Sequence, residues 1–469
     1  MKKEICLILF AICLLAFDSC QDKDDFSSDK SLSLTFSADT IRFDTVFTTI
    51  GSATKQFKIY NRNGNSLTIE SIELMNAAKS GFRMNIDGKK GTSLTNIDIL
   101  KKDSLYGFVE VTVDPTNSKN PLLIRDSIRL TVNGNTRYIQ LEVVGQDVYI
   151  WKDKVTVTKD SVITGDKPIL IYNTLVINKG VKLDVEKGTT FFLRNNAVID
   201  ISGTLVAHGE LNEPVVFRGS RFDNIEADIP FDNVPGQWTG VIFRSDSYHN
   251  ILENVVVKNA IRGVTFDASE PGIQKADLVN TIVQNTSEYG LQAINCKITA
   301  RNCLFANSRG SVAALLGGEY SFLHCTLANY YRWAARRAEC LELSNSDGKD
   351  SYALTTCDFT NSIVFGSAQD ELYLSGRGTA AFNYVFRNCL LKTPEQANEH
   401  FVNIIWNANP LFVDLNGKGI YSYNFSLQAI SPVINKADKA YSLQAPLDLK
   451  GRSRLADSNP DIGCYEWAE

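Results

Sequence analysis

The chain has 469 residues, and its 48 Lys and Arg against 53 Asp and Glu leave a net charge of −5. A hydrophobic content of 44% excludes a disordered chain. The slightly acidic total disfavours a nucleic-acid binder, which needs a basic face. No apolar run reaches about 18 residues, so we expect no membrane-spanning helix in the mature chain.

The first residues have the features of a secretory signal peptide. A basic start precedes an apolar run at 5–17, which ends shortly before Ser19 and Cys20. A lone Cys after such a run resembles a bacterial lipoprotein cleavage site, so we expect a signal peptide at 1–19 and a lipid, such as palmitate, on Cys20. The alternative is a peptide cleaved elsewhere, with Cys20 incidental. Residues 20–30 form a polar tether whose acids resemble the surface-export signal of Bacteroidota lipoproteins.

Residues 31–148 predict a compact all-β domain. Apolar and polar residues alternate at 128–132 and 139–143, and an Asn-Gly pair lies between the two runs. That pair is a strong signal for a two-residue hairpin. Roughly seven strands in this length favour an immunoglobulin-like β-sandwich. The region has no cluster of catalytic residue types, and we interpret it as a spacer or docking module.

Residues 149–469 follow a different pattern. Very short strands alternate with Gly or Asn turns, as in 175–193 and 197–209. Such segments are too short and too evenly spaced for hairpins, so each strand is expected to stack on the next coil of a parallel β-helix. Six similar segments between 254 and 391 begin 26, 22, 22, 37 and 27 residues apart. A coil of about 22 residues with loop insertions explains this spacing.

Asparagines recur at fixed places in these segments. Like residues of neighbouring coils lie about 4.8 Å apart, so their amides can exchange hydrogen bonds along the stack. We expect two structural ladders, with His324 as a substitute in the first. The first ladder comprises Asn254, Asn280, Asn302, Asn361 and Asn388, and the second comprises Asn259, Asn285, Asn307 and Asn329.

The ten cysteines do not indicate a disulfide framework. Two leave with the predicted signal peptide and Cys20 takes the lipid, which leaves seven, all from Cys296 onward. Cys303, Cys325 and Cys389 occupy one slot of the repeat, where we expect them to act as small apolar residues inside the stack. A bridge between Cys303 and Cys325 is within geometric reach and stays open.

Several stretches resemble a known group of proteins. Residues 203–209 (Gly-Thr-Leu-Val-Ala-His-Gly), 213–217 and 235–243 (Pro-Gly-Gln-Trp-Thr-Gly-Val-Ile-Phe) resemble secreted bacterial proteins of the pectin-lyase-like fold. Residues 43–54 resemble the leading domain of Bacteroidota cell-surface lipoproteins, and 461–466 resembles their Asp-Ile-Gly-x-Tyr-Glu C-terminus, of the choice-of-anchor type. The resemblance implies an immunoglobulin-like sandwich followed by a right-handed parallel β-helix at an outer-membrane surface.

The resemblance also implies where chemistry could lie. Lyases of that fold use acids around Ca²⁺ with an Arg or Lys base, and hydrolases use paired Asp residues. The central coils show no such pair. Asp246 and His249 could form an acid/base pair, although a solvated loop explains them as well. Asp448 and Arg452 are expected to fix the last coil, and no His pair has metal-ligand spacing.

Two loops carry weaker candidates. The loop 222–238 holds four acids that could bind Ca²⁺ but are equally typical of a solvated loop. An insertion after Asn329 combines aromatic and Arg residues, which suit sugar rings and carboxylates, although a loop folded on the flank explains it too. Its ligand-binding candidates are Tyr330, Tyr331, Arg332, Trp333, Arg336 and Arg337.

Three functions remain open. The first is a lipid-anchored envelope protein that binds glycan or another envelope component without catalysis, with no metal or cofactor required. The second is a polysaccharide lyase or glycoside hydrolase, and the third is a structural or adhesive stalk. The expected partners are the membrane, through the lipid, and polysaccharide.

Overall fold

The computed structural model describes residues 25–226, 229–415, 422–456 and 458–468. The predicted signal peptide and Cys20 therefore lie outside the described residues. The chain divides into two compact units that meet between Asp147 and Val148. Both are built almost entirely of strands, so the predicted all-β fold is confirmed. No helix in the described part of the chain is long and apolar enough to cross a membrane.

The first unit consists of two five-stranded sheets. The β8 sheet has the order β1 (Thr35–Phe36), β3 (Lys55–Tyr60), β8 (Ser104–Val111), β5 (Phe82–Ile86) and β6 (Lys89–Gly91). The β10 sheet has the order β2 (Thr40–Phe47), β10 (Asn135–Gln146), β9 (Leu122–Val132), β4 (Leu67–Leu74) and β7 (Ser93–Ile99). A short helix, α2 (Ala77–Ser80), precedes β5.

One apolar core lies between these two sheets. Alternate side chains of both sheets enter it, and Phe43 of β2 meets Phe82 of β5 with ring centroids 5.7 Å apart. The Asn133-Gly134 turn joins β9 to β10 as the sequence predicted, with both residues at positive φ. Ten strands form where about seven were expected, because short edge strands such as β1 and β6 leave little pattern in the sequence. The immunoglobulin-like plan stays a prediction.

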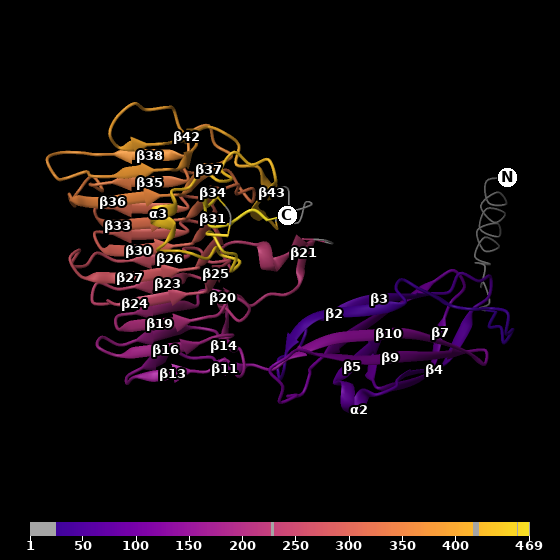
Figure 1. Cartoon of the computed structure of the whole chain (residues 1–469). Helices are drawn as coiled ribbons and strands as arrows, with labels where there is room; N and C mark the ends of the chain where they lie inside the picture. The colour runs from indigo at the N-terminus through magenta and orange to yellow at the C-terminus, as the bar shows by residue number, and fades with distance from the viewer. Residues whose placement is uncertain (1–24, 227–228, 416–421, 457, 469) are drawn as a thin grey trace, which may run out of the picture. The chain divides into compact units, whose positions relative to one another are not determined.

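The second unit is a parallel β-helix with three sheets, and its stacked coils are seen from the side in Figure 1. The β11 sheet comprises β11 (Tyr149–Trp151), β14 (Ile169–Ile171), β17 (Thr190–Leu193), β20 (Val215–Gly219), β25 (Val255–Lys258), β28 (Ile282–Thr286), β31 (Leu304–Ser308), β34 (Thr326–Asn329), β37 (Ile363–Gly366), β40 (Leu390–Leu391) and β42 (Ile405–Trp406). The β12 sheet comprises β12 (Val155–Val157), β15 (Thr174–Ile177), β18 (Val198–Ile201), β23 (Gly240–Phe243), β26 (Val264–Phe266), β29 (Leu291–Ile294), β32 (Ala313–Leu316), β35 (Leu341–Ser344) and β38 (Leu372–Ser375). The β13 sheet comprises β13 (Ser161–Ile163), β16 (Lys182–Glu186), β19 (Thr204–His208), β24 (Asn250–Glu253), β27 (Gln274–Val279), β30 (Lys297–Arg301), β33 (Gly318–Leu323), β36 (Leu354–Thr360), β39 (Val385–Arg387) and β41 (Phe401–Val402).

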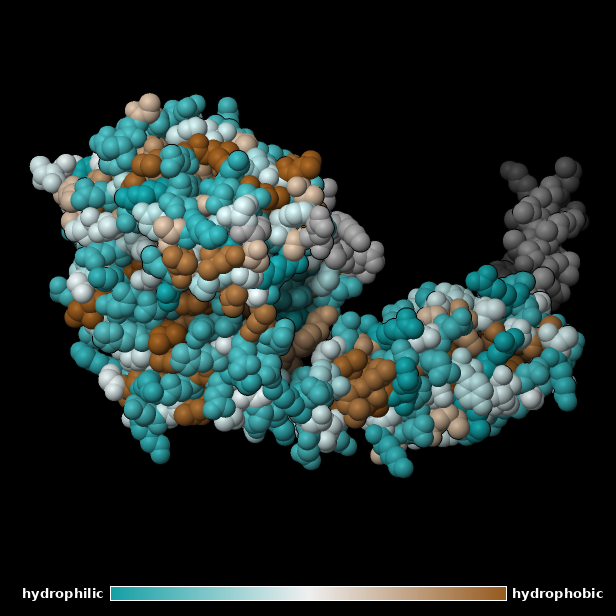
Figure 2. All heavy atoms as spheres, viewed as in Figure 1, coloured by the Kyte–Doolittle hydropathy of each residue, from teal (hydrophilic) through white to brown (hydrophobic). Residues whose placement is uncertain are grey.

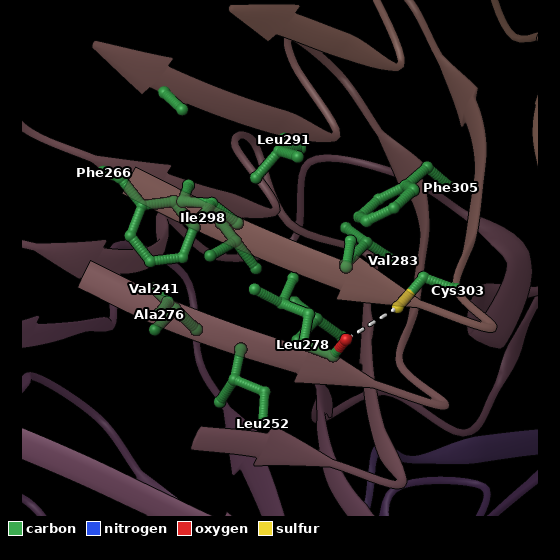
Figure 3. Close-up of a cluster of buried hydrophobic side chains, with 14 of the residues drawn as sticks. Val241, Leu252, Phe266, Ala276, Leu278, Val283, Leu291, Ile298, Cys303 and Phe305 are labelled. Atoms are coloured by element: carbon green, nitrogen blue, oxygen red, sulfur yellow. Dashed lines mark hydrogen bonds between the residues drawn. The ribbon is translucent and has the colours of Figure 1, made fainter. Parts of the chain in front are cut away.

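The interior of the β-helix is filled by columns of like side chains in register. Phe243 pairs with Phe266 of the next coil, and their rings stack with centroids 4.7 Å apart. Figure 3 shows Phe266 with Leu, Ile, Val and Ala side chains that converge from the three sheets. Because each coil buries its apolar face only against its neighbours, the stability of this unit comes from nearest-neighbour stacking. Hydrophilic side chains cover most of the face seen in Figure 2.

A single left-handed residue turns the chain from the β13 sheet into the β11 sheet. Asn tolerates this conformation better than other residues with a side chain. Asn280 donates to Asn254 at 3.2 Å, and Asn302 donates to Asn280 at 3.3 Å, so amides stack across these coils. The corner residues, all at φ near +50°, are Asn254, Asn280, Asn302, His324, Asn361, Asn388 and Asn403.

The second proposed ladder does not form, and that prediction is wrong. No hydrogen bond joins any two amides among Asn259, Asn285, Asn307 and Asn329, all of which are described. Asn259 instead donates to the carbonyl of Asp232 at 2.7 Å, and Asn329 donates to that of Ser308 at 2.9 Å. At this side of the coil, nearby backbone carbonyls take the amide N–H groups in place of the next amide.

At several of these corners the next residue is a small hydrogen-bond donor. The Cys303 thiol donates to the carbonyl of Leu278 in the preceding coil at 3.5 Å (Figure 3), and the thiols of Cys325 and Cys389 each make the matching contact with the coil before their own. Thr281 does the same with its hydroxyl at 2.8 Å. All seven cysteines from Cys296 onward are buried and free, so Cys303 and Cys325 are not bridged.

The C-terminal segment covers the outer face of the β11 sheet. It contains β43 (Phe412–Asp414), β44 (Asn424–Leu427) and α3 (Lys439–Ser442), and its yellow trace crosses the middle coils in Figure 1. Phe412, Phe425 and Ile462 pack on outward apolar residues of β31, β34 and β37. This is why the outer face of the β11 sheet is apolar although it lies outside the coil.

Buried polar contacts fix this segment to the corner asparagines. Arg454, which has no exposed surface, pairs with Glu466 and donates to Asn302 at 2.9 Å. Asp448 accepts from the backbone N–H groups of Arg452 and Glu466, at 2.7 and 2.8 Å. The Asp-Ile-Gly-x-Tyr-Glu stretch therefore helps to hold the C-terminal segment against the coils of the β-helix.

Candidate functional site

The predicted insertion lies at one corner of the β-helix. Residues 330–340 connect β34 to β35, whereas the preceding coil makes the same connection with only 309–312. The insertion therefore projects from the corner between the β11 and β12 sheets. A projecting insertion of this kind is a candidate ligand site.

The Arg336 side chain anchors the insertion and does not face solvent. Its guanidinium forms two parallel hydrogen bonds with Glu371, of 2.7 and 2.5 Å, and Glu371 is fully buried. Glu371 also accepts from the backbone N–H groups of Cys340 and Ala368, at 3.0 and 2.7 Å. The prediction that Arg336 contacts a ligand is wrong, because its charge is already neutralised inside the protein.

The two tyrosines of the insertion are buried as well. Tyr330 packs edge-on against Phe412 at 6.4 Å, and its carbonyl accepts from the Tyr423 hydroxyl at 3.1 Å. Tyr330 and Tyr331 each keep only 8% of their surface exposed. Neither ring can offer an open face to a sugar, so this part of the prediction is also wrong. Trp333 is half-buried and has contacts of its own.

Three arginines around Tyr331 stay without a carboxylate partner. Arg332 and Arg337 are exposed, and Arg309 of the preceding coil is half-buried. Arg337 donates its backbone N–H to the Arg309 carbonyl at 2.7 Å, which holds the two residues together. None of the three forms an ion pair within the described ranges. By contrast, Arg262 in the same β-helix pairs with a carboxylate.

The guanidinium groups of Arg309 and Arg337 also act on the Tyr331 hydroxyl. Burial raises the pKa of Tyr331, while the charges of these two arginines act in the opposite direction. The arginines are therefore close enough to Tyr331 to form one electrostatic unit. Sequence reasoning found Arg332 and Arg337 from the aromatic and Arg residues of the insertion, but it missed Arg309, which only the stacking of coils brings beside the insertion.

The outer face of the β12 sheet borders this insertion. Gln292, Ala314 and Glu342 point outward in register from three consecutive coils. Ser311 donates to Glu342 at 2.5 Å, and burial raises the pKa of the Glu342 carboxyl above its usual range. This carboxyl was not singled out from the sequence, because nothing in the local pattern distinguishes it from a solvated acid.

The same sheet carries an Arg with two acids on neighbouring coils. Arg244 binds Asp200 through two hydrogen bonds of 2.8 Å and approaches Asp267 at 3.4 Å. Hydrogen bonding to Asp200 raises the pKa of Arg244 above its already high value. The guanidinium of Arg244 is therefore already occupied by carboxylates of the protein itself. Sequence reasoning missed Asp200, which lies 44 residues before Arg244.

The other candidate residues from the sequence do not come together in one site. Asp246 pairs with Lys179 at 3.1 Å, and the structure shows no contact between Asp246 and His249. In the loop 222–238, Asp232 pairs with Lys258 at 2.8 Å and is neutralised. Asp228 and the Glu226 side chain lie outside the described residues. Among those that are described, no group of three His, Cys, Asp or Glu side chains could hold a metal ion.

Comparisons with known proteins add little about activity. No protein-family model matches the chain, and no curated protein matches it. Among solved structures, a family 123 glycoside hydrolase from Clostridium perfringens is 7% identical, with a TM-score of 0.18, and covers 26% of this chain. This chain spans only 30% of that hydrolase.

Two further solved structures cover more of the chain. The A-module of a mannuronan C-5 epimerase from Azotobacter vinelandii is 10% identical over 56% of this chain and 91% of its own, with a TM-score of 0.26. The catalytic unit of an α-1,3-glucanase from Streptomyces thermodiastaticus is 9% identical over 75% and 89%, with a TM-score of 0.25. Structural similarity at this level of identity and TM-score does not indicate the function of this chain.

Proposed function

We propose that this protein binds an acidic glycan without transforming it, at the insertion of the β-helix, and that a lipid on Cys20 holds it at the outer-membrane surface. The observation that carries the proposal is the group of Arg309, Arg332 and Arg337. These are three guanidinium groups on one corner of an acidic protein, and none of them pairs with a carboxylate among the described residues. Guanidinium groups bind carboxylates and sulfates with paired hydrogen bonds.

The architecture of the corner supports this binding role. The buried ion pair between Arg336 and Glu371 fixes the insertion to the next coil. The backbone that carries Arg332 and Arg337 is therefore held in one conformation. Binding then loses less conformational entropy than it would on a mobile loop. The stacked coils supply a long flank along which an extended chain can lie.

Affinity measurements with a uronic-acid polymer test the proposal. We expect polygalacturonate to bind the mature chain and neutral dextran not to bind, with affinity falling as salt increases. The double variant R332A/R337A should weaken binding about tenfold or more. The matched control R62A/R137A removes two exposed arginines from the sandwich and should leave the affinity unchanged.

Other outcomes would favour the alternatives. Equal binding by R332A/R337A and by the control would refute the insertion as the site. Release of unsaturated uronates or new reducing ends would favour a lyase or hydrolase, and a protein that binds no polysaccharide would favour a stalk.

The lipid anchor needs its own test, because Cys20 lies outside the described residues. Labelling with palmitate should be lost in Cys20→Ala, and that variant should leave the membrane fraction. Labelling that survives the substitution would refute the anchor without bearing on glycan binding.

A further inference from the structure

A cavity lies in the first unit, which we interpreted from the sequence as a spacer or docking module. It has a volume of about 460 Å³ and lies on the outer face of the β8 sheet, over β5, β6 and β8. Met84 and Val109 face the core, whereas the alternate residues Asn85 and Phe108 face outward into the cavity. Ligand sites in proteins span roughly 300–1,000 Å³, so this one suits a small ligand.

The cavity contains a hydrogen-bond acceptor without a donor. The Oδ1 atom of Asn85 is buried and has no hydrogen-bond partner. Asn85 lies directly across the strand pair from Phe108, so the amide and the ring stand side by side. A buried acceptor left unpaired costs free energy that a ligand hydroxyl or N–H would recover.

The floor and the rim differ in character. Phe108 is half-buried, and its ring lies nearly parallel to that of Tyr106, with centroids 6.4 Å apart. At the rim, Arg83 is occupied by Glu110 and Thr112, each at 2.9 Å. Lys90 is exposed and has no ion pair in the part of the chain that the structure describes. One aromatic face, one free acceptor and one free cation therefore meet in this cavity.

We propose that this cavity binds one uronic-acid residue. The C–H face of the sugar ring lies on Phe108, a ring hydroxyl donates to Asn85 Oδ1, and the sugar carboxylate pairs with Lys90. This site is independent of the insertion in the β-helix. It gives the chain a second place to hold an acidic sugar, and it stands even if the insertion binds nothing.

Titration of the mature chain with galacturonic acid tests the proposal, with galactose as the neutral comparison. The R332A/R337A background weakens binding at the insertion, so that binding at the cavity can be followed. In that background Asn85→Leu should weaken galacturonate binding about tenfold or more. Gln56→Leu makes the same side-chain change beside Phe108 but outside the cavity, and it should have no effect. Lys90→Ala should remove the preference for galacturonate over galactose.

Two further measurements keep the outcome decisive. If Asn85→Leu lowers the melting temperature, Asn85→Asp replaces it, because its carboxylate repels the ligand with little change in shape. All five tryptophans follow residue 148, so a change in tryptophan fluorescence reports on the β-helix and not on this cavity. Equal affinities for Asn85→Leu and Gln56→Leu, or no saturable binding in the R332A/R337A background, would overturn the proposal.

Discussion

Replacing His324 by Asn should make the stability of this protein less sensitive to acid. His324 is fully buried at a corner where the other coils carry Asn. Its Nδ1 donates to the Gly463 carbonyl at 3.3 Å, and its Nε2 lies 2.7 Å from the Ser442 hydroxyl and 3.1 Å from the Asn361 amide nitrogen. Burial lowers the pKa of this imidazole, which is therefore neutral at neutral pH.

The size of the effect follows from the difference in proton binding. Burial, with the nearby Arg454 cation, lowers the pKa of His324 well below its usual range. The unfolded chain binds this proton below about pH 6.5 and the folded chain does not, so stability falls as the pH drops. The loss reaches about 1.4 kcal/mol per pH unit, or about 2 kcal/mol between about pH 8 and pH 5.

Urea unfolding of the wild type and of His324→Asn near pH 8 and near pH 5 measures this difference. Other groups titrate equally in both chains, so the two losses of free energy should differ by about 2 kcal/mol. Asn accepts the left-handed corner, and the variant should remain folded at neutral pH. An identical loss in both proteins would show that His324 is not held neutral and would refute the reasoning.

Three other predictions follow from the same contacts. Arg336→Ala leaves Glu371 buried without its countercharge and should lower the free energy of unfolding in urea by about 3–5 kcal/mol. Arg336→Met combined with Glu371→Leu should recover most of this loss. A loss below about 1 kcal/mol for Arg336→Ala would contradict this reasoning. Asn280→Leu should destabilise by about 1–2 kcal/mol more than Asn280→Gly in thermal unfolding, because only glycine accepts the corner without strain; equal losses would argue against a strained corner. Burial raises the pKa of Cys296, Cys389 and Cys464 to about 12. All seven buried thiols should therefore resist a thiol reagent until the chain is denatured, and fast reaction of the folded protein would contradict their burial.

The repeated asparagines made the β-helix predictable. A coil that turns on one residue needs a left-handed residue at the same place in each turn, and Asn meets that need. The spacing of 22 residues between Asn280 and Asn302 therefore equals the number of residues in one coil. The column at Asn259 also has positive φ at Asn259, Asn285 and Asn307, but its predicted amide ladder does not form, because the sequence does not show which backbone groups lie near these amides.

The insertion shows where sequence reasoning reached its limit. Tyr330 and Arg336 have the composition of a binding loop, yet their partners Phe412 and Glu371 come from the C-terminal segment and from the next coil. Local sequence cannot distinguish a side chain that meets solvent from one covered by a segment that returns along the chain. The same holds for Asn85, which is an ordinary strand residue until its neighbours enclose its amide oxygen.

Composition excluded a disordered chain and predicted no membrane-spanning helix, and the sequence by itself determined the all-β class, the coil length and the corner positions. These are local or periodic properties, since each follows from residues within one turn of the repeat. Only the tertiary structure decided which charges remain free. Whether an arginine is neutralised depends on carboxylates that stacking brings beside it. Arg336 is paired in this way, whereas Arg332 and Arg337 have no ion pair with any residue that the structure describes.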